Sequence, residues 1–248
     1  MKKTLKIAML YPREMNIYGD HGNLEVLTHR AKLYGFDVEQ IIYEPDEKLP
    51  ADVDIILGGG GQDSGQNKIV DDLIKIGSQL HKLAGNGVPM LMICGLYQLF
   101  GHYFLTKDDQ KIAGIGIFDM VTKAGSERLI SNIVTNWDDY KLVGYENHSG
   151  LTTLNNKQKP FAKVVAGAGN NGDDQTEGAR IHNVFGSYLH GPILSKNPKF
   201  ADELLMLAAR RKFSDEFLKP RDESAKKQLV KIHEIAEQAR EIAMKRPR

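Results

Sequence analysis

The sequence predicts an α/β protein: a mainly parallel sheet flanked by helices, with an antiparallel extension and a C-terminal helix. Short apolar runs typical of buried strands alternate with helical segments up to residue 100, and this alternation forms right-handed βαβ units. Beyond residue 105, short apolar or alternating segments separated by turn residues favour antiparallel strands. We therefore expect one α/β domain over residues 1–212 and a helical extension over residues 213–248.

The first hundred residues are expected to hold four strands and two helices. Apolar runs predict strands at residues 5–11, 36–43, 53–57 and 88–93. Helical patterns between them cover residues 24–33 and 68–83, and glycines follow both segments.

The rest of the chain is expected to be mostly strands followed by two helices. The expected strands are residues 112–118, 128–135, 142–145, 161–166 and 180–185. The expected helices cover residues 198–212 and a C-terminal segment with apolar residues at helical spacing over 229–243. This last helix either closes over the parent domain or docks a partner. A G-x-G-x-x-G motif at residues 167–172 is interpreted as a surface turn, because no helix follows it.

The composition narrows the classes of function. Thirty-three basic and 32 acidic residues give a net charge of +1, which argues against nucleic acid as an obligate partner. A single cysteine cannot form an internal disulfide, which favours the cytoplasm. No apolar run approaches a membrane span, so membrane insertion is not expected.

The single cysteine, Cys94, follows the buried run of residues 88–93 and precedes Gly95 and a helical segment. A sharp strand-to-helix turn of this kind presents a nucleophile above the sheet and points a helix N-terminus at it. A lone cysteine is more often a small buried hydrophobe. A catalytic role therefore requires a base elsewhere in the chain.

Two other segments could complete such a site. The glycine-rich residues 58–63 form either a flexible turn or a nest of backbone N–H groups that faces the cysteine. His190 follows an expected strand and is either the polar end of that strand or the required base. His182 and His190 lack metal-ligand spacing, so no metal site is expected.

Together these segments resemble the class I glutamine amidotransferases of the cobyric-acid-synthase-like branch. Cys94-Gly-Leu-Tyr-Gln98 is similar to the elbow of that class, and Tyr188-Leu-His-Gly-Pro192 is similar to the histidine segment of that branch. The chain looks most like the glutaminase subunits of lipid II isoglutaminyl synthases. The motifs that carry this likeness are residues 58–63, Arg128, Tyr18-Gly-Asp-His-Gly-Asn23 and Gly144-Tyr-Glu-Asn-His-Ser-Gly150.

The resemblance implies a glutamine amidotransferase domain that hydrolyses L-glutamine. Cys94 would attack the side-chain amide as a thiolate, and His190 would protonate the departing ammonia. Arg128 would bind the α-carboxylate of glutamine, although without the resemblance it is equally well interpreted as a surface charge. The other implied contacts are backbone N–H groups near Gly60 and Gly95 and the side chains of Gln98 and Asn147.

One position departs from the wider class. Most of its members carry a glutamate two residues after the histidine, whereas this chain has Pro192. The sequence therefore predicts a Cys-His dyad, completed either by an acidic residue that the motifs do not identify or by a backbone carbonyl.

The resemblance also implies a division of labour between two chains. This chain has no nucleotide-binding loop, so no cofactor is expected on it. A Mur-ligase-like synthetase subunit would form a heterodimer with it, bind ATP and Mg, and amidate the D-glutamate of lipid II. Two alternatives remain open: another cysteine hydrolase on the same fold, such as a peptidase, and an inactive domain that serves as a binding scaffold.

Overall fold

The computed structural model describes residues 3–155, 157–215 and 217–246, and a six-stranded sheet forms its centre. The strand order is β11-β12-β4-β3-β1-β2, and all neighbours are parallel except β11 and β12. These strands are β1 (Thr4–Leu10), β2 (Asp37–Tyr43), β3 (Ile55–Gly58), β4 (Met90–Ile93), β11 (Ala179–Ile181) and β12 (Val184–Ser187).

A second sheet is built around a long antiparallel hairpin. Strands β7 and β8 form this hairpin. Strands β5 and β6 extend the sheet from the amino-terminal part of β7, and β9 and β10 extend it from the carboxyl-terminal part. Their bounds are β5 (Tyr103–Leu105), β6 (Lys111–Ala113), β7 (Met120–Trp137), β8 (Tyr140–Leu154), β9 (Ala162–Ala166) and β10 (Thr176–Glu177). The predicted antiparallel extension is therefore confirmed, as a separate sheet with two strands far longer than expected.

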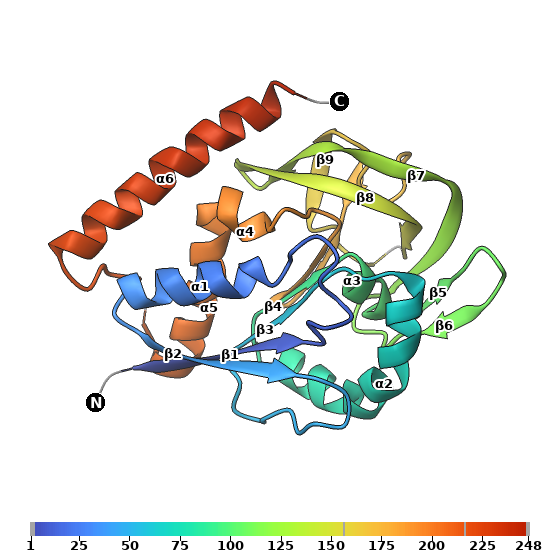
Figure 1. The fold of residues 1–248 in the computed structure, drawn as a ribbon, viewed down its shortest axis with the longest axis horizontal. Coiled ribbons are helices and arrows are strands. Elements are labelled where there is room, and N and C mark those ends of the chain that lie inside the picture. The colour runs from blue at the N-terminus through green and yellow to red at the C-terminus, as the bar shows by residue number, and fades with distance from the viewer. Residues whose placement is uncertain (1–2, 156, 216, 247–248) are drawn as a thin grey trace.

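Helices cover both faces of the first sheet (Figure 1). The chain leaves β1 towards one edge and β3 towards the other, so right-handed crossovers place α1 and α2 on opposite faces. The helices are α1 (Gly22–Leu33), α2 (Asp63–Gly85), α3 (Gly95–Leu99), α4 (Ile193–Lys196), α5 (Pro198–Phe213) and α6 (Glu223–Met244).

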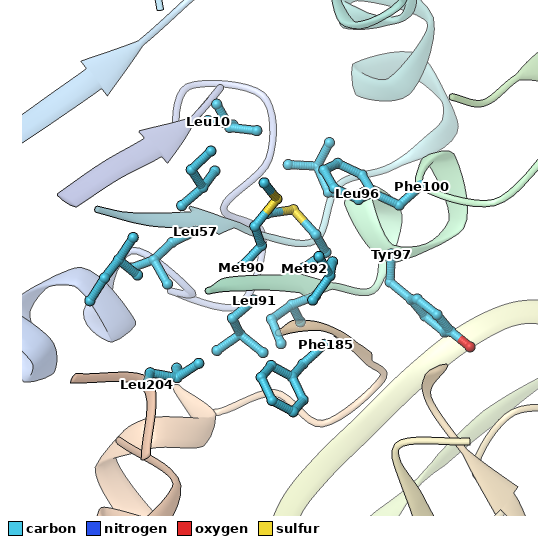
Figure 2. Close-up of a cluster of buried hydrophobic side chains, with 14 of the residues drawn as sticks. Leu10, Leu57, Met90, Leu91, Met92, Leu96, Tyr97, Phe100, Phe185 and Leu204 are labelled. Carbon is cyan, nitrogen blue, oxygen red and sulfur yellow. The ribbon is translucent and has the colours of Figure 1, made fainter. Parts of the chain in front are cut away.

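Strands β3 and β4 are buried on both faces because neither carries a polar side chain. All four residues of β4 are buried. Figure 2 shows Met92 on the same side as Leu96, whereas Leu91 points to the other side, towards Phe185 and Leu204. A near-continuous apolar run is what a doubly covered parallel strand requires.

The C-terminal helix α6 lies along the outside of α1 and α4 (Figure 1). Its inward face is partly charged: the guanidinium of Arg240 is buried, donates a 3.0 Å hydrogen bond to Asn197 Oδ1 and lies 4.1 Å from the ring centroid of Tyr140. Asn197 Oδ1 also accepts the Val143 backbone N–H at 3.0 Å. Arg240 therefore ties α6 to the segment that connects β8, α4 and α5.

Three sequence predictions need correction. Helix α2 begins at Asp63 rather than at residue 68. The strand expected at residues 112–118 ends at Ala113. The strand expected at residues 180–185 is two antiparallel strands, because His182 adopts a φ of 51° and reverses the chain.

The loop at residues 167–172 opens no helix, as expected, but it is not simply a surface turn. The backbone N–H groups of Ala168 and Gly169 donate to the buried carboxylate of Glu146 at 2.8 and 2.9 Å. Asn170 is fully buried and accepts the hydroxyl of Tyr97 at 3.0 Å. This loop therefore closes the space between the two sheets.

Candidate active site

The site lies at the edge of the first sheet where its parallel strands end. Strands β1 and β3 are neighbours, and the connections that follow them run towards opposite edge strands of the sheet. Such a switch point opens a crevice at the carboxyl ends of the strands. The segments that follow β1, β3, β4 and β12 therefore meet there. They bring in Asp20, the glycine loop, Cys94 and His190 respectively.

Cys94 occupies a strained turn between β4 and α3. Its backbone has φ 48° and ψ −102°, an unusual conformation for a residue with a side chain. Its N–H donates a 2.8 Å hydrogen bond to the carbonyl of Ser187 at the end of β12. The residue is 6% exposed, and it borders a cavity at the carboxyl ends of the strands. The predicted strand-to-helix turn is therefore present.

His190 is fully buried and lies between Asp20 and Cys94. Its Nδ1 lies 3.1 and 3.2 Å from the two carboxylate oxygens of Asp20. Its backbone exchanges hydrogen bonds of 2.8 and 3.2 Å with Tyr145 on β8. Among the described residues, no geometric hydrogen-bond partner is found for its Nε2. The ring is thus anchored at Nδ1, which leaves Nε2 for the chemistry.

The surroundings of His190 favour its charged form. Burial lowers the pKa of the imidazole, but the adjacent side chains of Asp20 and Cys94 favour the charged ring, outweigh burial and raise the pKa from 6.5 to about 10. The same interactions hold the ring in the orientation that a general acid and base needs.

Asp20 is the acidic residue that the sequence motifs did not identify. It lies in the turn between β1 and α1, 170 residues before the histidine, and is fully buried. One of its oxygens also accepts the Gly60 N–H at 2.8 Å. The signal that could have revealed it is a carboxylate within a glycine-rich turn that follows a buried strand, at the same sheet edge as Cys94.

The glycine loop after β3 packs against both reactive side chains. A Cβ atom on Gly60 would lie 2.7 Å from His190 Cε1 and 3.1 Å from Cys94 Cβ, so only glycine fits there. Because Gly60 N–H is engaged by Asp20, it does not face the cavity as a donor. None of the hydrogen bonds found among the described residues uses the N–H of Gly61 or Gly95, which lie beside each other.

A cavity of about 550 Å³ opens over Cys94. It brings together four residues from distant parts of the sequence, which are Cys94, Gln98, Arg128 and Asn147. The three other predicted residues, Gly60, Gly95 and His190, are buried and do not line it. Gly61 lines it instead.

Arg128 reaches the cavity because β7 is interrupted where it pairs with β8. The register shifts between Ala124 and Leu129, and Arg128 lies in this irregular stretch. Its Nε donates to Asn147 Oδ1 at 2.8 Å, and one terminal nitrogen donates to the Asn147 carbonyl at 3.3 Å. Asn147 in turn donates to the hydroxyl of Tyr145 at 3.2 Å. The exposed guanidinium is thus held at the rim of the cavity.

The amide of Gln98 is already committed within the protein. Its Oε1 accepts from Gln66 at 2.8 Å, and its Nε2 donates to the hydroxyl of Tyr188 at 3.1 Å. A Cβ on Gly150 would lie 2.4 Å from that nitrogen. Gln98 therefore shapes the floor of the cavity.

The described residues show neither a metal centre nor a membrane-spanning helix. In that part of the chain, no group of histidine, cysteine, aspartate and glutamate side chains is arranged to hold a metal ion. Within the same residues, no helix is long and apolar enough to span a membrane.

The fold of this chain is that of solved glutamine amidotransferases. A chain of PurLQS from Thermotoga maritima matches 86% of this chain and 99% of its own length, with a TM-score of 0.52 and 17% identity. A glutamine amidotransferase crystal structure matches 82% of this chain and 98% of its own, with a TM-score of 0.54 and 13% identity. These likenesses concern the fold.

Sequence comparison places the chain more closely. It belongs to the family of CobB/CobQ-like glutamine amidotransferase domains, whose model matches residues 6–198. It is 37% identical over 245 residues to the lipid II isoglutaminyl synthase (glutamine-hydrolyzing) subunit GatD of Streptococcus pneumoniae, covering 97% of this chain and 92% of that protein. The protein of the same name from Staphylococcus aureus is 38% identical over 201 residues, covering 80% and 82%. A probable cobyric acid synthase of Methanococcus maripaludis is 30% identical over 156 residues, covering 57% and 31%.

Proposed function

We propose that this chain is the glutaminase subunit of a lipid II isoglutaminyl synthase. It hydrolyses L-glutamine to glutamate and ammonia and supplies the ammonia to a Mur-ligase-like synthetase. The observation that carries the proposal is the junction of Cys94, His190 and Asp20 in a chain that matches the streptococcal relative along 97% of its length. The acceptor is the α-carboxyl group of D-glutamate in lipid II.

The reaction begins at the sulfur of Cys94. The thiolate attacks the side-chain carbonyl carbon of glutamine, and the carbonyl oxygen becomes an oxyanion. His190 gives its Nε2 proton to the amide nitrogen, the C–N bond breaks and ammonia leaves. The glutamyl group remains on Cys94 as a thioester. His190 then takes a proton from water, which attacks the thioester, releases glutamate and restores the Cys94 thiolate beside the protonated His190.

The surrounding residues support these steps. The N–H groups of Gly61 and Gly95 stabilise the oxyanion, because Gly60 N–H is held by Asp20. Asp20 orients the His190 ring and stabilises the imidazolium. Gly60 provides the space in which the histidine and the cysteine approach each other.

The rim of the cavity binds the amino-acid end of glutamine. Arg128 binds the α-carboxylate, since a guanidinium fork matches two carboxylate oxygens. Asn147 fixes the guanidinium and contacts the substrate, and Gln98 supports the floor beneath the side-chain amide.

A second chain performs the energy-requiring step. Amidation of a carboxylate needs activation by ATP with Mg, and this chain offers no nucleotide-binding loop. The two chains form a cytoplasmic heterodimer in which only the synthetase handles lipid II. Both curated relatives at 37–38% identity carry the word subunit in their names.

The test uses two nitrogen sources in the reconstituted heterodimer with ATP and lipid II. His190→Ala should abolish amidation from glutamine, whereas ammonium at high concentration should restore product because the synthetase is intact. Cys94→Ala is the matched control and should behave in the same way. If the wild-type pair uses ammonium but never glutamine, or if ammonium rescues neither variant, the proposed division of labour is wrong.

A further inference from the structure

A buried carboxyl group outside the cavity contacts the segment that carries His190. Glu177, the last residue of β10, is fully buried. Its Oε1 accepts the Tyr188 backbone N–H at 2.7 Å and the Ser187 hydroxyl at 3.1 Å. Both donors lie within three residues of His190.

The same segment is bonded to the nucleophile. The Ser187 carbonyl accepts the Cys94 N–H at 2.8 Å, which fixes the strained turn from the side of β12. The Ser187 hydroxyl oxygen accepts the Leu189 N–H at 3.0 Å, which shapes the backbone just before His190. A displacement of Ser187 would therefore move both reactive side chains.

Groups on other elements also hold residues 187–190, the segment that carries His190. His190 exchanges two backbone hydrogen bonds with Tyr145 on β8. The Tyr188 hydroxyl contacts Thr152 at 2.7 Å and accepts from Gln98 at 3.1 Å. Between the end of β12 and the backbone bridge of His190 to β8, Glu177 holds the chain by accepting the Tyr188 N–H.

The chemistry of Glu177 suits a neutral acceptor. Burial raises the pKa of its carboxyl from 4.5 to about 8, against the hydrogen bonds from Tyr188 and Ser187, which lower it. Its Oε2 is buried without a partner among the described residues, so no cation balances a charge there. The group therefore works through the acceptor Oε1, which a glutamine side chain would also provide.

We propose that Glu177 is a positioning residue that sets the distance between Cys94 and His190 by holding Ser187 and Tyr188 through Oε1. The proposal rests on the proposed function, because it concerns the same pair of reactive groups. Glu177 touches neither the substrate cavity nor Arg128, so it controls turnover and not glutamine binding.

The test compares Glu177→Met, Glu177→Gln and Ser187→Ala in the full chain. Two readouts are needed: the rate of Cys94 alkylation by iodoacetamide in this chain alone, and kcat and KM for glutamine in the heterodimer. Asp54→Leu is the matched control, since Asp54 is another buried carboxylate that accepts a backbone N–H. It lies next to the amino end of β3, at the opposite edge of the sheet.

Glu177→Met leaves the two donors without an acceptor. It should lower kcat and the alkylation rate by about tenfold to a hundredfold, because small misplacements of reacting groups carry losses of this size. KM should stay within about twofold, and Glu177→Gln should keep most of both rates. Ser187→Ala should lower kcat by several-fold. Asp54→Leu should lower the melting temperature and leave both rates unchanged.

Several results would overturn the assignment. One is a Glu177→Met protein that melts lower but keeps wild-type kcat and alkylation, since Glu177 would then be structural only. Another is Glu177→Gln as impaired as Glu177→Met, since charge and not the acceptor would then matter. If Glu177→Met does not fold, unchanged rates in Ser187→Ala refute the proposal. A wild type that hydrolyses no glutamine, while Glu177→Met still slows alkylation, refutes the proposed function and supports the positioning.

Discussion

Replacement of Asp20 by asparagine separates its charge from its shape. The asparagine side chain would keep an oxygen for the Gly60 N–H, which Asp20 now accepts at 2.8 Å. It would lose the negative charge beside His190 Nδ1, where the two oxygens lie at 3.1 and 3.2 Å. The backbone and the packing should stay close to those of the wild type, because the two side chains have nearly the same size.

The expected loss follows from the charge-assisted hydrogen bond. A hydrogen bond to a charged group contributes about 1.5–3 kcal/mol, which corresponds to about ten- to a hundredfold in kcat/KM at about 1.4 kcal/mol per factor of ten. The raised pKa of His190, about 10, rests on Asp20 and Cys94 acting against burial. Without the Asp20 carboxylate, the effect of burial is opposed less strongly, so the pKa of His190 falls.

Two measurements check this prediction. Glutamine hydrolysis by the heterodimer gives the loss in kcat/KM. The pH profile of Cys94 alkylation by iodoacetamide should shift to higher pH in Asp20→Asn, because a less basic imidazole is a poorer partner for the thiolate. An unchanged profile together with full glutaminase activity would show that Asp20 is a structural carboxylate that does not act through His190.

The remaining contacts of the site give three more predictions. Arg128→Ala should lower kcat/KM for glutamine by about ten- to a hundredfold, and Arg128→Lys should recover part of this loss. The rate of Cys94 alkylation by iodoacetamide should not change. Equal losses in glutamine hydrolysis and in alkylation would contradict a carboxylate contact. Gly60→Ala should reduce kcat at least tenfold, because the new Cβ would lie 2.7 Å from His190 Cε1. Gly85→Ala is the control and should leave kcat unaltered, because nothing lies within 4 Å of a Cβ at that position. Wild-type kcat in Gly60→Ala would refute the tight fit. The melting temperature should fall between pH 4.5 and 8, because unfolded Glu177 releases its proton near 4.5 while the folded group holds it to about 8. Glu177→Gln should flatten this decline, and a parallel decline would contradict it.

His190 adds a second component to the pH dependence of stability. Because the pKa of the folded group is raised from 6.5 to about 10, its contribution is complete below pH 6.5 and is lost as the pH rises through 10. His190→Ala should therefore lose stability relative to the wild type at pH 6 more than at pH 10, as measured by urea unfolding. An equal loss at both values would mean that the imidazole is not charged in the folded state.

The central sheet could be predicted from sequence because β3 and β4 carry no polar side chain and the other two parallel strands of the first hundred residues still contain apolar runs. Residues 5–11, 36–43, 53–57 and 88–93 each contain an observed parallel strand, or all but its end. The second sheet was harder, because long twisted hairpins mix polar and apolar residues without a clean period. The turn at His182 carries no glycine, so two strands looked like one.

In the site, too, some features follow from local sequence patterns and others do not. The elbow around Cys94 and the segment of His190 are local patterns, and sequence reasoning found both. Asp20 approaches His190 only when the ends of β1 and β12 meet across two other strands, and no local pattern encodes that meeting. The engagement of Gly60 by Asp20 was hidden for the same reason, so the free donor is one residue later than expected.

The backbone of Cys94 has a consequence for the evolution and engineering of this protein. A residue with a side chain at φ 48° and ψ −102° carries a conformational penalty on the order of 1–3 kcal/mol, and glycine would adopt the same angles freely. Selection for thermal stability alone would therefore favour glycine at the position where the proposed mechanism requires sulfur. Libraries screened by melting temperature should therefore also be selected for turnover, because the most thermostable variants would include ones without catalytic activity.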